Sequence, residues 1–138
     1  MYMKDWIKKI NQFGFHDTFL TSITCCGLEI KLEFENGLYF LDKKGKETVL
    51  SNPINLTLKI NPFYESAINA LEIKEYGKKL KYIEYIDFKN DFKKSKFSIG
   101  MVYFSTFGNS FLFDGGFPNK MMLISIEGVD DIVIEENA

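Results

Sequence analysis

His16 is the only histidine of the chain, and it stands next to Asp17. A histidine with a carboxylate partner can act as the base of a nucleophilic triad, for which Cys25 or Cys26 would supply the nucleophile. Adjacent residues on an extended chain point to opposite faces, however, so Asp17 is not expected to orient the imidazole of His16. We predict instead that the pair shapes the turn before the first strand, with Asp17 accepting backbone N–H groups. No catalytic residue and no enzymatic activity are expected.

The residue types that hold metals and cofactors are scarce. One histidine forms no cluster, and two adjacent cysteines suit neither a multi-cysteine zinc site nor a disulfide framework. The run Asp114-Gly115-Gly116 lacks the spacing of a phosphate-binding or dinucleotide-binding loop, and we expect an ordinary loop over 114–118. The sequence therefore predicts no metal site and no cofactor.

The charged residues restrict the partners of the protein. The 138 residues include 19 acidic and 17 basic ones, a net charge of -2, and every basic residue is a lysine. Arginine is the usual reader of guanine and the usual clamp for phosphate, so direct nucleic-acid binding is not expected. No segment approaches the roughly 20 apolar residues of a membrane span, and Met1 to Gln12 is charged where a signal peptide is apolar. We expect a cytoplasmic protein that does not bind membranes.

Length and composition are typical of a single domain, 1–138, with a β-rich core. A chain of this size buries roughly two-thirds of its unfolded surface, and 16% of its residues are aromatic, which suits a β-sheet interior. The helical spacing of Trp6, Ile7, Ile10 and Phe13 predicts an N-terminal helix over Met3–Phe13 that covers the sheet.

A three-stranded meander is predicted after this helix. Apolar residues occupy odd positions up to Cys25 and even positions from Leu28, so the parity switches at a two-residue hairpin loop, Cys26-Gly27. The expected facing pairs are Cys25 with Leu28, Ile23 with Ile30, Thr21 with Leu32, and Phe19 with Phe34. Asn36-Gly37 predicts a second hairpin that sets Phe34 opposite Tyr39 and Leu32 opposite Leu41.

The rest of the chain favours further strands and one more short helix. The segment Phe63–Lys81 is compatible with a helix capped at Asn61 or with a strand, and we choose a strand over 70–76 followed by one over 80–86. Asp87–Lys94 is predicted to be the helix, with Asp87 as its N-cap. Other strands are expected over 47–50, 55–61, 97–107, 110–113, 121–127 and 131–135. The fold class is therefore α+β, mainly antiparallel sheet arranged as a meander, sandwich or half-barrel.

The Phe-His-Asp motif at 15–17, followed by the alternating strand Leu28–Phe34, resembles the start of small bacterial immunity proteins of polymorphic-toxin and contact-dependent inhibition systems. The resemblance covers about the first quarter of the chain. It implies a β-rich domain that binds and neutralises a cognate toxin, which in such systems can be a nuclease with a basic groove. An acidic strand face would complement such a groove. The expected partner-binding residues are Glu29, Glu33, Glu35, Asp130 and Asp131.

A small-ligand-binding β-barrel or sandwich is the alternative, with a cavity lined by Phe104, Phe107, Phe111 and Phe113. An apolar cavity would favour this alternative, whereas a filled core under an exposed acidic or aromatic patch would favour the toxin-binding protein. The chain is expected to be a monomer or homodimer, because an edge strand over 131–135 could pair with a second copy or with a strand of a partner.

Overall fold

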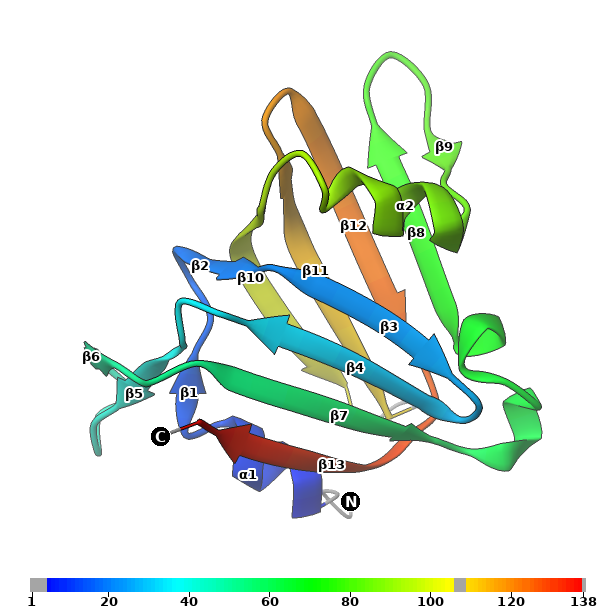
Figure 1. Ribbon diagram of the computed structural model, residues 1–138. Coiled ribbons are helices and arrows are strands. Elements are labelled where there is room, and N and C mark those ends of the chain that lie inside the picture. Colours follow the sequence, from blue (N-terminus) through cyan, green and yellow to red (C-terminus); the bar gives the residue numbers. More distant parts are fainter. Residues whose placement is uncertain (1–4, 106–108, 138) are drawn as a thin grey trace.

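The computed structural model describes residues 5–105 and 109–137, whose strands are all paired in antiparallel fashion. Two large sheets face each other, and their strands cross steeply (Figure 1). The sheets are not closed into a barrel. The predicted α+β class with mainly antiparallel sheet is thus confirmed, and of the arrangements left open the sheets form a sandwich.

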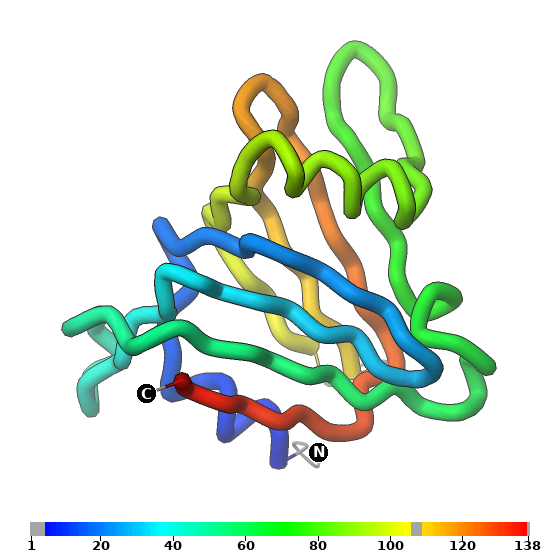
Figure 2. Tube along the Cα trace, viewed as in Figure 1, coloured from blue at the N-terminus to red at the C-terminus, as the bar shows by residue number. Residues whose placement is uncertain are grey.

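The four-stranded sheet has the order β13 (Val129–Glu136), β7 (Ile54–Ile60), β4 (Glu29–Phe34) and β3 (Ser22–Cys26). The six-stranded sheet has the order β2 (Thr18–Leu20), β10 (Phe97–Ser105), β11 (Ser110–Phe117), β12 (Lys120–Ile126), β8 (Leu71–Tyr76) and β9 (Lys81–Tyr82). A small sheet consists of β1 (Phe13–Gly14), β5 (Tyr39–Leu41) and β6 (Glu47–Leu50). The β5–β6 and β8–β9 hairpins project from the body of the molecule (Figure 2).

The predicted hairpin between β3 and β4 is present, but its register differs by two residues. Cys25 pairs with Ile30 and Ile23 pairs with Leu32, so the loop residues are Gly27 and Leu28. Gly27 adopts φ 57°, which glycine reaches without steric cost. Because side chains alternate with a period of two, a shift of two residues keeps the apolar set on the inner face.

The predicted meander is wrong at its third strand. β5 pairs with β1 and β6, whereas the second edge of β4 pairs with β7. β7 matches β4 over six residues, with the apolar side chains of both strands facing the core, whereas β5 has three residues. The longer apolar strand therefore takes the edge of β4, and the turn at Gly37 leads the chain out to the small sheet.

Several other predicted elements are present with different bounds. Within the described residues the first helix, α1, covers Asp5–Ile10, and it ends before Phe13 because Phe13 and Gly14 join β1. The ambiguous segment forms two 3-10 turns, η1 (Pro62–Tyr64) and η2 (Ala67–Ala70), before β8, and Asn61 caps the first through its side chain. Of the strand predicted over 80–86, only β9 (Lys81–Tyr82) forms. The second helix, α2, covers Tyr85–Asp91 and so takes the last two residues of that prediction; its N-cap is Glu84, not Asp87.

The loop predicted over 114–118 is also wrong, because β11 continues to Phe117. A Cβ atom on Gly115 would lie 2.0 Å from the carbonyl oxygen of Ser98 in β10. Gly115 therefore allows β10 and β11 to approach each other closely and is not part of a loop. Of the predicted Gly108-Asn109 turn, only Asn109, with φ 49°, lies within the described residues.

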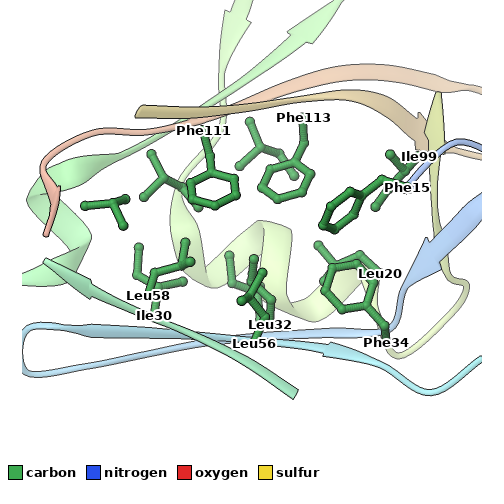
Figure 3. Packing of buried hydrophobic residues seen from close by; sticks show 14 of the residues in the cluster. Phe15, Leu20, Ile30, Leu32, Phe34, Leu56, Leu58, Ile99, Phe111 and Phe113 are labelled. Atoms are coloured by element: carbon green, nitrogen blue, oxygen red, sulfur yellow. The ribbon is translucent and has the colours of Figure 1, made fainter. Parts of the chain in front are cut away.

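The core fills the space between the two large sheets. Side chains from both sheets point toward one another there (Figure 3), and the Trp6 ring of α1 stacks on Phe111 at 4.7 Å between ring centroids. Phe111 in turn lies 5.9 Å from Phe113 in a stacked arrangement. α1 lies beside β13, and α2 lies against β3 and β8, so each helix covers one open side of the sandwich (Figure 1).

Candidate partner-binding surfaces

His16 and Asp17 form a turn that is joined to β10. Asp17 adopts φ 59°, and this left-handed conformation brings its carboxylate 3.4 Å from Nε2 of His16. Our expectation that Asp17 does not orient the imidazole was wrong, because it assumed an extended backbone. The carboxylate faces the ring, while the backbone N–H of Asp17 donates to the carbonyl of Ile99.

The other ring nitrogen of His16, Nδ1, lies 2.6 Å from the carbonyl oxygen of Gly100, at the bulge in β10 between Ile99 and Met101. This hydrogen bond is the main cause of a raised pKa for His16, and the charge of Asp17 adds to it. Both contacts favour the protonated ring. The His16 side chain is largely exposed, and the arrangement ties the turn before β2 to the bulge.

The two cysteines lie on β3 and differ in their exposure. Cys25 is half-buried against the core, and burial raises the pKa of its thiol to about 11. Cys26 ends β3 and is exposed. No contact between His16 and either cysteine occurs within residues 5–105 and 109–137, so the residues considered for a nucleophilic triad are not brought together there.

The outer face of the four-stranded sheet carries most of the acidic residues predicted to bind a partner. It contains four carboxylates and two ammonium groups, from Glu29, Glu33, Asp131, Glu135, Lys31 and Lys59. Glu29 pairs with Lys59 at 3.7 Å, and Asp131 pairs with Lys9 of α1 at 3.5 Å. The face is therefore acidic, but two of its four carboxylates are already in ion pairs.

The remaining two predicted residues lie at the periphery of this face. Glu35 follows β4 and is exposed, and its backbone N–H donates to the hydroxyl of Thr21. Asp130 lies in the bulge at the start of β13, where its carboxylate accepts a hydrogen bond from the amide of Asn61 at 3.3 Å. The sheet thus brings together Glu29, Glu33 and Asp131 on one surface and leaves Glu35 and Asp130 at its ends.

The outer face of the six-stranded sheet is a second surface, and our sequence reasoning missed it. Large apolar side chains from β2, β10, β11, β12 and β8 share this face, and the strand registers place them in adjacent rows. Its exposed members are Phe19, Met101, Tyr103, Met121 and Tyr76, with Leu112 and Leu123 half-buried between them. We call these seven residues the apolar face.

A signal for the apolar face was present in the sequence. Neighbouring positions such as Met121 and Met122, or Tyr103 and Phe104, are both apolar, so these strands have apolar side chains on two faces. Met122 is buried in the core, whereas Met121 is 70% exposed on the opposite face. Such a doubled pattern indicates either a covered second face or a binding surface, and the helices cover other parts of the sandwich.

Several hollows lie at the surface of the part of the chain that the structure describes. An open groove of about 540 Å³ runs beside β13, between that strand and the residues Lys9, Gln12 and Phe13. A second one of about 420 Å³ lies between β3 and α2. Phe111 and Phe113, two of the residues predicted to line a ligand cavity, are fully buried in ring contacts of the core, and Phe104 packs on Phe111. Phe107 lies outside the described residues.

Within the part of the chain that the structure describes, no group of three or more His, Cys, Asp or Glu side chains is placed to hold a metal ion. The helices of that part are all too short or too polar to cross a membrane.

Comparison of the chain with protein-family models, with curated proteins and with solved structures found no match. The function must therefore be argued from the surfaces themselves.

Proposed function

We propose that this protein is a non-catalytic immunity-type protein that binds a cognate toxin domain and neutralises it in the cytoplasm. The observation that carries the proposal is the apolar face, an exposed set of Met, Tyr, Phe and Leu side chains on a sheet whose other side is packed in the core. Soluble proteins rarely expose large contiguous apolar patches unless a partner covers them.

The composition of the apolar face supports a protein partner. Aromatic residues and methionine are enriched at the centres of protein interfaces, where charged residues are depleted. Within the face, the carboxylate of Asp114 stands between Met101 and Leu123. At its border, Glu72 pairs with Lys74 at 3.0 Å. Binding a folded domain here would bury the apolar side chains and leave the Glu72–Lys74 ion pair at the rim.

The acidic outer face of the four-stranded sheet supports a toxin with a basic surface, such as a nuclease. Four carboxylates against two ammonium groups create a negative field that would steer a basic partner and speed association. Glu29, Glu33, Glu35, Asp130 and Asp131 remain our proposed contributors to this field. The two faces lie on opposite outer sides of the sandwich: the acidic one would attract a basic partner to the protein, and the apolar one would form the buried contact.

The test is co-expression with the protein encoded by the adjacent gene, followed by size-exclusion chromatography and a growth assay of that neighbour expressed alone. A complex, together with rescue from growth inhibition, is the expected result. The variant Met121→Lys should abolish rescue, because it places a charge at the most exposed apolar side chain of this face, next to Tyr76. Val49→Lys is the matched control, since Val49 is 66% exposed on β6, and it should rescue like the parent protein.

Absence of both toxicity and complex formation would contradict the proposal. Rescue that is equally strong with Met121→Lys would instead contradict the assignment of the apolar face. The alternative of a small-ligand carrier finds less support, because the rings expected to line its cavity fill the space between the sheets.

A further inference from the structure

β13 forms one edge of the four-stranded sheet, and the direction of its backbone groups follows from the register. The N–H of Asn137, which continues β13, donates to the carbonyl of Pro53 at 2.8 Å, so this residue turns its backbone toward β7. Backbone groups alternate in direction along an antiparallel strand. Asp131, Val133 and Glu135 therefore bond to β7, whereas Ile132, Ile134 and Glu136 turn their N–H and C=O groups to the open edge.

One outward N–H group is already satisfied. The backbone N–H of Ile132 donates to the carboxylate of its neighbour Asp131 at 2.9 Å, and this carboxylate also pairs with Lys9. For the N–H groups of Ile134 and Glu136, residues 5–105 and 109–137 provide no acceptor. The C-terminal half of β13 thus offers unpaired backbone donors and acceptors, which is the template for adding a strand.

The open edge is accompanied by space for an added strand. The groove of about 540 Å³ follows Asp131, Ile132, Val133, Ile134 and Glu136, and its opposite wall is formed by α1 and β1. On the inner side of β13, the half-buried Ile134 lies near Phe13, so an added strand would meet an apolar wall there. On the outer side, it would lie beside the carboxylates of Asp131 and Glu135.

The negative charge of β13 indicates which kind of segment could pair with its open edge. Within β13, residues 129–136 include four carboxylates, those of Asp130, Asp131, Glu135 and Glu136, and no basic residue. Antiparallel pairing of β13 with its copy would bring eight carboxylates together, because each strand contributes four. An extended segment with lysine or arginine at alternate positions would neutralise them instead.

We propose that the β13 edge is a second binding site that accepts an extended basic segment of another protein as an added antiparallel strand. Alternate apolar side chains of this segment pack toward Ile134 and Phe13, and its basic side chains lie beside Asp131 and Glu135. The site goes beyond the apolar face proposed above for the toxin, because it lies on the other sheet and depends on backbone groups of an edge strand; it shares Asp131 with the acidic face.

The probe is a capped seven-residue peptide that alternates lysine with valine, titrated into ¹⁵N-labelled protein. The amide signals of Ile134 and Glu136 should shift, and their hydrogen exchange should slow. Residues that face each other in an added strand point their side chains to the same side, so the valine N–H groups face β13. A peptide with N-methylated valines should therefore not bind, and neither should one with glutamate in place of lysine.

Charge reversal on the protein supplies a matched pair of variants. Glu33 and Glu135 lie in the same row of the outer face, each opposite Asn55, but only Glu135 belongs to the edge strand. Glu135→Lys should lower the affinity for the peptide by about five- to tenfold, the size expected for reversing one partly exposed ion pair. Glu33→Lys should change the affinity for the peptide by no more than about twofold, because the new lysine on β4 lies two strands away from the edge strand β13.

Three results of the peptide experiments would overturn the proposal. They are no amide shift at millimolar peptide, equal binding of the N-methylated peptide, and equal weakening by the two charge reversals. A dimer in light scattering that is lost in Glu135→Lys would also overturn it, because a second copy would then occupy the edge. The peptide experiment needs no toxin, so its failure is separate from failure of the proposed function.

Discussion

Nδ1 of His16 lies 2.6 Å from the carbonyl oxygen of Gly100, and this contact joins the turn before β2 to the bulge of β10 across 84 positions of the chain. The bond and the nearby Asp17 carboxylate both raise the pKa of His16 above its ordinary value of 6.5. Because the folded pKa is the higher one, the stabilisation is complete below pH 6.5 and is lost as the pH rises through the folded pKa.

We therefore predict that the free energy of unfolding of the parent protein, relative to that of His16→Gln, decreases from pH 5.5 to pH 8.5. Guanidinium unfolding at several pH values measures this difference. The folded pKa is read from the imidazole signal in an NMR titration, and Asp17→Asn should lower it. A His16 pKa at or below 6.5 in the folded protein would contradict the prediction.

Gly37 and Gly45 form a matched pair for testing a close backbone approach. Both adopt φ 79°, but a Cβ atom on Gly37 would lie 2.2 Å from the carbonyl oxygen of Ser51, whereas one on Gly45 would have no neighbour within 4 Å. Gly45→Ala should cost about 1–2 kcal/mol for the left-handed conformation alone. Gly37→Ala should cost clearly more, because the backbone at Ser51 must move. An equal loss of unfolding free energy in the two variants, measured by chemical denaturation, would contradict this and show that the backbone at Ser51 moves at no cost.

Proline substitution tests the backbone directions assigned to β13. Ile134→Pro removes an N–H group that faces the open edge, whereas Val133→Pro removes one that bonds to β7. Each variant also loses a partly exposed apolar side chain, so the difference between them reports mainly the ladder hydrogen bond. Val133→Pro should be less stable than Ile134→Pro by about 1–3 kcal/mol. If Ile134→Pro were the less stable variant, the hydrogen bonds from β13 to β7 would have to begin one residue further along. The proposed strand addition would then lose its basis.

The cysteines are predicted to react with alkylating agents at very different rates. Burial raises the pKa of Cys25 to about 11, so about one thiol in a thousand is ionised at pH 8, and the thiolate is the reactive form. Iodoacetamide at pH 8 should therefore modify the exposed Cys26 first, which peptide mass spectrometry can follow. In guanidinium the two rates should converge. Faster modification of Cys25 in the folded protein would mean that β3 opens away from α2.

Much of the local structure could be predicted from the sequence, because it depends on short-range patterns. Alternation of apolar residues and the positive φ of Gly27 produce the hairpin of β3 and β4, and the helical spacing of Trp6, Ile7 and Ile10 produces the buried side of α1. The same alternation placed Glu29 and Glu33 on the outer face of β4. Each of these features is decided within about ten residues.

The tertiary structure decided the features that depend on competition between distant segments. β7 rather than β5 pairs with β4, because the longer apolar strand buries more surface. The left-handed turn at Asp17 brings its carboxylate to His16, an arrangement that an extended chain would forbid. The apolar face depends on which of two apolar sides of β10 and β12 meets the other sheet. Since both sides read alike in sequence, only packing against the opposite sheet could distinguish core from binding surface.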